Sequence, residues 1–179
     1  MAEAALKKMP GARMLVIPAL VPPHKATHDL AGAAERLDMC RMAFGRLPIT
    51  VSDIELIRSG PSYTSDTVSA LADEYADTQF YFLCGMDMFA SLARWHESDY
   101  LKNKLVFMVA GRPDSPDRDE AISAFNAAGG RALPVDMPPC AISSTDVRGR
   151  ICSGRSAVEL LPDTVAEYIE KHKLYQKRG

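Results

Sequence analysis

The sequence of 179 residues has almost no excess of charge of either sign, since 21 Lys and Arg stand against 23 Asp and Glu, a net charge of −2. Proteins that bind the nucleic-acid backbone gain from an excess of Lys and Arg, so nucleic acid is not the expected partner. No apolar run approaches the roughly 20 residues that cross a bilayer, and we expect no membrane-spanning segment. Apolar residues make up 47% of the chain, and at this low net charge they predict a folded protein.

Cysteines are few and widely spaced. The four of them (Cys40, Cys84, Cys140 and Cys152) form no CxxC pair, and without clustered ligands a zinc site is not indicated. Residues 1–11 contain no apolar core of the kind that a secretory signal needs. These absences predict reduced thiols in a cytoplasmic protein. The length suits a single domain over residues 1–179, with a C-terminal helical part over 142–179.

Segments with the character of buried strands alternate with segments of helical spacing. The clearest strands are 79–84 and 105–110, and apolar residues within 65–75 recur at the spacing of an amphipathic helix. The predicted order is helix 1–8, strand 13–18, helix 30–44, extended segment 49–57, helix 65–75, strand 79–84, helix 86–95, strand 105–110, helix 117–128, strand 131–135, helix 143–153 and helix 162–173. This alternation predicts an α/β fold built on a parallel sheet with helices on both faces.

Ligands of such sheets bind outside the carboxyl ends of the strands, so residues directly after strands are the first candidates for a site. They are Pro22 to Lys25, Gly85 to Asp87, Arg112, and Ser143 to Arg148. The cations Lys25 and Arg112 suit a phosphate group, although solvated loop positions explain them equally simply.

Residues 142–148 open a helix with three hydroxyl side chains in a row. Unpaired N–H groups at a helix N-terminus attract phosphate, and Arg148 lies four residues after Ser144, one turn into the helix. An ordinary N-cap at Ser143, with Asp146 favouring the helix dipole, is the commoner use of such residues. Local physics therefore favours a cap and leaves a phosphate site open.

Gly85 and Asp87 follow a strand directly. Glycine lets a ligand approach closely, and Asp87 can accept hydrogen bonds from ribose hydroxyls or help to hold a metal. Capping of the next helix explains the pair about equally well. Trp95, the only tryptophan, can stack on a flat heteroaromatic ring, but a place in the core or at its rim is the commoner role.

Thr64 and its backbone N–H precede a predicted helix, where they can bind a carboxylate. Capping by Ser65 or Asp66 is the preferred interpretation on local grounds. The histidines His28, His96 and His172 have no partner pattern, and we expect them to be surface residues.

Taken together, the motifs Val-Pro-Pro-His-Lys (21–25), Gly-Pro-Ser-Tyr-Thr-Ser-Asp-Thr (60–67), Cys-Gly-Met-Asp (84–87) with Trp95-His96, Gly-Arg-Pro (111–113) and Ile-Ser-Ser-Thr-Asp-Val-Arg (142–148) stand in a characteristic order. The set closely resembles the bacterial nicotinate-nucleotide adenylyltransferases of the HxGH nucleotidyltransferase superfamily. The resemblance extends to residues 160–175 and so covers essentially the whole chain. It implies a Rossmann-like fold.

The resemblance also implies an activity, the transfer of AMP from ATP to nicotinate mononucleotide, with deamido-NAD and pyrophosphate as products in NAD biosynthesis. Mg²⁺ would accompany ATP. The mononucleotide phosphate would attack the α-phosphate of ATP in line, without a covalent enzyme intermediate, so that catalysis consists of positioning and electrostatic stabilisation.

The same resemblance implies roles for single residues. Thr64 would bind the nicotinate carboxylate, Trp95 would stack on the pyridine ring, and Arg112 would meet a substrate phosphate. Lys25 would supply positive charge nearby. The nucleotide would be bound by Gly85, Asp87, Ser143, Ser144 and Arg148.

One feature of the family is absent from this sequence. The family opens with a strand and a GxFDPxHxGH loop whose two histidines stabilise the transferring phosphate, and no HxGH occurs here. We therefore expect a sheet without its first strand and a chain without catalytic histidines, with little turnover but with retained ligand affinity. A truncated sequence is the favoured explanation, and a natural variant without catalysis is the other.

Two alternative functions remain open. A phosphopantetheine-type adenylyltransferase shares a hydroxyl-rich helix start, although the Ser-Tyr-Thr-x-Asp-Thr stretch and the spacing from Asp87 to Trp95 argue against it. A non-catalytic nucleotide-binding remnant fits the absence of HxGH. A homo-oligomer is compatible with each of these functions.

Overall fold

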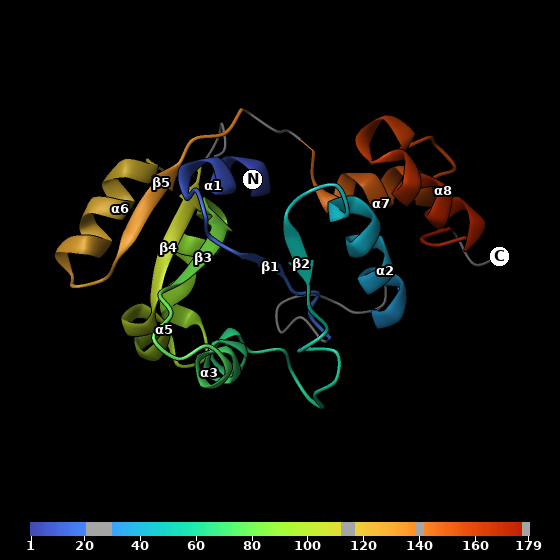
Figure 1. The fold of residues 1–179 in the computed structure, drawn as a ribbon. Coiled ribbons are helices and arrows are strands. Elements are labelled where there is room, and N and C mark those ends of the chain that lie inside the picture. Colours follow the sequence, from blue (N-terminus) through green and yellow to red (C-terminus); the bar gives the residue numbers. More distant parts are fainter. Residues whose placement is uncertain (21–29, 112–116, 139–141, 177–179) are drawn as a thin grey trace. The chain divides into compact units, whose positions relative to one another are not determined.

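The computed structural model describes residues 1–20, 30–111, 117–138 and 142–176, which form two compact units (Figure 1). Unit 1 comprises Met1–Ala12 and Tyr63–Cys140, and unit 2 comprises Arg13–Ser62 and Ala141–Gly179. None of the described helices is long and apolar enough to cross a membrane.

Unit 1 is built on a parallel sheet of three strands in the order β3-β4-β5. The strands are β3 (Phe80–Gly85), β4 (Leu105–Ala110) and β5 (Ala132–Val135). Five of the six residues of the central strand β4 are buried, as expected for a continuous apolar run in a parallel sheet. Phe80 pairs with Leu105 and Gly85 with Ala110, so β3 and β4 end at the same edge.

The described residues of unit 1 form six helices: α1 (Ala2–Lys8), α3 (Thr64–Glu74), α4 (Met86–Ala90), the 3₁₀ helix η2 (Leu92–Arg94), α5 (Ser98–Lys104) and α6 (Arg118–Ala127). Helices α1, α4, α5 and α6 contact the sheet. The core contains Leu101, Leu105, Phe107 and Val109, each at most 1% exposed. Phe125 packs edge-on against Phe107 and so joins α6 to β4. The unit thus has its own apolar core.

Unit 2 contains a second parallel sheet, formed by β1 (Met14–Val16) and β2 (Ile49–Val51). The helices among its described residues are α2 (Ala33–Phe44), α7 (Ser144–Cys152), η3 (Val158–Leu160) and α8 (Asp163–Lys171). Helix α8 packs on α2 through an apolar cluster around Val165, Ile169 and Leu174.

The predicted α/β class and the parallel strands are confirmed, and the described strands form two sheets flanked by helices. Three predicted details are wrong. The extended segment 49–57 is a strand only to Val51, because residues 53–57 form a turn in which the amides of Leu56 and Ile57 donate to the Asp53 carbonyl. The helix predicted over 86–95 is split into α4 and η2, and α5 and η3 were not predicted.

Candidate functional site

The described candidate residues fall into the two units. Thr64, Gly85, Asp87 and Trp95 belong to unit 1, and Ser143, Ser144 and Arg148 belong to unit 2. Lys25, His28 and Arg112 lie outside the described residues.

Gly85 and Asp87 follow β3 at its carboxyl end, as the sequence predicts. Gly85 is buried and is the N-cap of α4, and Asp87 is exposed in the first turn of that helix. Burial, with the charge of Asp87 as a smaller cause, raises the pKa of the neighbouring Cys84 to about 12. The Cys84 thiol is therefore neutral near pH 7. The exposed carboxylate of Asp87 is a group that a ligand at this edge can reach.

Trp95 follows η2 and is half-buried. Its indole N–H donates to Ser91 Oγ at 3.0 Å, and its ring lies edge-on to Phe82, with ring centroids 5.5 Å apart. The indole thus packs against the core of unit 1 while part of it remains exposed. A ring held by a hydrogen bond and by packing is a fixed surface on which a flat ligand ring can stack.

Thr64 is the first residue of α3 and is half-buried. The predicted capping of this helix by Ser65 or Asp66 is wrong: Tyr63 is the N-cap residue, and no side chain caps the helix. Ser65, 0% exposed, instead shares a hydrogen bond of 3.1 Å with Nδ1 of His96. His96 is exposed as predicted, yet it has this partner and also stacks on Tyr63.

Ser143 and Ser144 open α7 in unit 2. Ser143 is an N-cap whose Oγ accepts from the amide of Asp146 at 3.1 Å and donates to the carboxylate of the same residue at 2.5 Å. The predicted N-cap at Ser143 is therefore confirmed. Ser144 is exposed. Arg148 is half-buried. It lies near Tyr175, whose pKa is raised by burial and lowered to a smaller extent by the charge of Arg148. A phosphate at this helix start remains a prediction.

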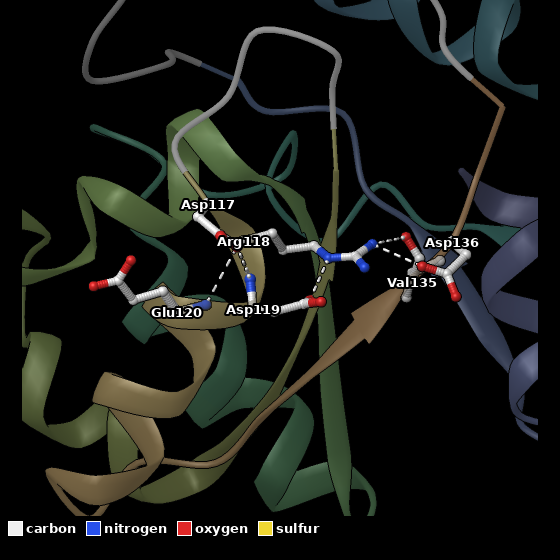
Figure 2. A network of polar contacts seen from close by, with 6 residues as sticks. All are labelled: Asp117, Arg118, Asp119, Glu120, Val135 and Asp136. Atoms are coloured by element: carbon white, nitrogen blue, oxygen red, sulfur yellow. Dashed lines mark hydrogen bonds and ion pairs between the residues drawn. The ribbon is translucent and has the colours of Figure 1, made fainter.

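Arg118, the first residue of α6, is a polar centre that sequence reasoning missed (Figure 2). Its Nη1 donates to Asp136 at 2.9 Å and to the Val135 carbonyl at 3.1 Å, and its Nε donates to Asp119 at 3.0 Å. Desolvation lowers the pKa of Arg118, but the hydrogen bonds and charges of the two carboxylates outweigh it and raise the pKa. This side chain therefore ties the start of α6 to the carboxyl end of β5. No local signal links these segments in the sequence.

Acidic, cysteine and histidine side chains do not gather into groups of three or more that could hold a metal ion anywhere in the described residues. Mg²⁺ in nucleotide-dependent enzymes is commonly held by one or two carboxylates together with substrate phosphates. The exposed carboxylate of Asp87 fits that limited role.

Comparison with protein families gives a match over residues 1–150 to the model described as "Cytidylyltransferase-like". A relative from Exiguobacterium sibiricum is 37% identical over 175 residues, which cover 97% of this chain and 88% of the relative. A relative from Synechococcus sp. is 36% identical over 98% of this chain and 86% of its own length. Both carry the name "probable nicotinate-nucleotide adenylyltransferase".

Solved structures with the same fold include nicotinic acid mononucleotide adenylyltransferase of Plasmodium falciparum complexed with NaAD. The TM-score is 0.79 at 18% identity, and the match covers 97% of this chain and 89% of that one. The same enzyme complexed with APC matches with a TM-score of 0.76.

Proposed function

The chain belongs to the cytidylyltransferase-like family and, within it, to the nicotinate-nucleotide adenylyltransferases, and from this membership we propose that it binds nicotinate mononucleotide and ATP for the transfer of AMP between them. The products of that transfer are deamido-NAD and pyrophosphate. The observation that carries the proposal is the placement of Thr64 and Trp95 in one unit, with their sequence neighbours Ser65 and His96 in direct contact.

The nicotinate half of the substrate is assigned to unit 1. Trp95 stacks on the pyridine ring with the exposed part of its indole, and Thr64 binds the carboxylate at the N-terminal turn of α3, where backbone N–H groups point outward. Gly85 and Asp87, at the carboxyl end of β3 in the same unit, are assigned to the nucleotide and ribose region. These assignments are supported by the exposure of Asp87 and by the fixed orientation of Trp95.

The phosphates of ATP are assigned to Ser143, Ser144 and Arg148 at the start of α7. A helix of nine residues presents N–H groups and a partial positive charge there. Mg²⁺ bound together with ATP would neutralise phosphate charge there. Lys25 is assigned to supply positive charge nearby, and Arg112 is assigned to a substrate phosphate.

We assign the reaction to the cytoplasm. The described cysteines Cys40, Cys84 and Cys152 are free thiols, which fits a reducing compartment.

A thermal-shift experiment tests this proposal against the phosphopantetheine alternative. We expect nicotinate mononucleotide to raise the melting temperature of the chain in a concentration-dependent way, since a ligand that binds only the folded state stabilises it. Phosphopantetheine at the same concentrations should leave the melting temperature unchanged. Stabilisation by phosphopantetheine alone would replace the proposed substrate with that of the alternative.

A further inference from the structure

Ser65 and His96 form a polar pair in unit 1 that joins two segments 31 residues apart. Ser65 is in the first turn of α3 and is 0% exposed, whereas His96 is exposed and follows η2. Ser65 Oγ and His96 Nδ1 are 3.1 Å apart, within hydrogen-bond distance. A buried hydroxyl that loses its partner is costly, so the bond favours one arrangement of the two segments.

The face of the His96 imidazole is also in contact with an aromatic ring. It stacks on Tyr63 with ring centroids 4.3 Å apart and an interplanar angle of 18°. Tyr63 is the N-cap residue of α3, and its carbonyl accepts hydrogen bonds from the amide and the hydroxyl of Thr67. His96 therefore contacts the residues on both sides of Thr64.

The residue that precedes His96 in the chain is also held in place. His96 directly follows Trp95, whose indole is fixed by Ser91 and by the edge of Phe82. The pair thus links the residue assigned to the nicotinate carboxylate with the residue assigned to the pyridine ring.

We propose that Ser65 and His96 are positioning residues for the nicotinate half of the substrate, holding the N-terminal turn of α3 against the segment that carries Trp95. This inference rests on the proposed function. Neither side chain needs to touch the substrate. The pair preorganises the two groups that do, which lowers the cost of ordering them when nicotinate mononucleotide binds. We expect the binding of ATP to depend little on the pair, because the ATP phosphates are assigned to Ser143, Ser144 and Arg148 and not to the segments that carry Thr64 and Trp95.

The test is a set of substitutions that separate the hydrogen bond from the ring contact. Ser65→Ala removes the hydroxyl at little change in volume. His96→Phe keeps an aromatic ring for Tyr63 and removes the bond. His96→Asn removes the ring and places an amide close to the position of Nδ1, so it is the conservative variant that can restore the bond.

The chain offers matched controls. Ser69 is an exposed serine on the same helix, and Ser69→Ala reports on the loss of a hydroxyl from α3 alone. His172 is a second exposed histidine stacked on a tyrosine, with its ring 4.2 Å from that of Tyr168 in unit 2. His172→Phe therefore repeats the His96→Phe exchange outside the nicotinate segment.

Affinities for nicotinate mononucleotide and for ATP are measured separately on the full chain by isothermal titration calorimetry, with circular dichroism to verify folding. The fluorescence of Trp95, the only tryptophan, gives a second measurement of mononucleotide binding. We expect Ser65→Ala and His96→Phe to raise the Kd for the mononucleotide about tenfold, the scale of one hydrogen bond. The Kd for ATP should change less than about twofold. His96→Asn should recover most of the loss, and both controls should match the wild type.

Unchanged mononucleotide affinity in a folded His96→Phe chain would overturn the inference, and so would an equal loss of affinity for both ligands, which marks a general structural role. His96 is exposed, so this variant is informative even if Ser65→Ala fails to fold. A wild-type chain that binds ATP but no nicotinate mononucleotide would overturn the proposed function itself, and the inference with it.

Discussion

At the scale of single residues, one contact in unit 1 joins positions far apart in the chain. Local rules predict that Ser65 caps α3, whereas in the structure its hydroxyl is hydrogen-bonded to His96. By contrast, Ser143 does cap α7, because its bond to Asp146 spans only three residues. Capping rules depend on neighbours within a turn, and they fail where tertiary packing supplies a different partner.

Cys84 leads to a prediction for alkaline solution. Burial raises the pKa of this thiol from 9.0 to about 12, so the folded chain holds a proton that the unfolded chain releases. The contribution of this thiol to stability is complete below about pH 9 and is lost as the pH rises towards about 12. The free energy of unfolding should fall over this range, and the fall should be shallower for Cys84→Ala. Urea unfolding at several pH values measures both.

The thiols also provide a control for this prediction. At a pH near 8, the exposed Cys152 should react with Ellman's reagent in the native chain, and Cys84 should react only after unfolding. Identical alkaline profiles for the wild type and Cys84→Ala would contradict the assignment of the raised pKa to this residue.

At the scale of elements, long periodic segments could be predicted and short ones could not. Strand 105–110 has the predicted limits, because its apolar run is long enough to identify a buried strand. Helix α5 was missed, since its seven residues carry little periodicity and its position depends on the burial of Leu101, 0% exposed. Ile57 was assigned to a strand on its apolar character, and it is 77% exposed in a turn.

The packing of α8 on α2 yields a prediction for stability. Ile169 is 6% exposed in the cluster that joins these helices. Ile169→Ala removes buried methyl groups and leaves a cavity, so we expect the free energy of unfolding to fall by about 2–5 kcal/mol. Val158→Ala, at a position 54% exposed, should change it by less than about 0.5 kcal/mol. Urea denaturation followed by circular dichroism compares the two, and equal effects would refute the role of this cluster.

Arg118 connects α6 to the end of β5 and carries a second prediction at this scale. Arg118→Gln should lower the melting temperature by about 2–4 °C, the shift expected for a loss of about 1 kcal/mol in a chain of this size. Arg118→Lys should lose part of this, because lysine keeps the charge but not the forked geometry that reaches both Asp119 and Asp136.

Arg150→Gln serves as the control for Arg118, since Arg150 forms one ion pair within the described residues, with Glu159 at 2.8 Å. An isolated, largely exposed pair contributes little. If its removal lowered the melting temperature as much as Arg118→Gln does, the network around Arg118 would have no special role in holding α6.

At the scale of the whole molecule, class and family could be predicted from the sequence, whereas the arrangement of the chain into units could not. The order of motifs identified the family because those motifs are read one after another along the chain. The division into two units mixes segments from both ends with the middle of the sequence. This division depends on contacts between segments that are far apart in the sequence, and no local sequence pattern predicts those contacts.

The central claim is that this chain binds nicotinate mononucleotide through the aromatic surface of Trp95. Calorimetric titration of the wild-type chain and of Trp95→Ala with nicotinate mononucleotide, and with ATP as the reference ligand, tests it most directly. We predict saturable mononucleotide binding by the wild type and a Kd about 10- to 100-fold higher for Trp95→Ala, the scale of one aromatic stacking contact, with ATP binding retained. Equal mononucleotide affinities for the two chains, or no binding by the wild type, would contradict the account.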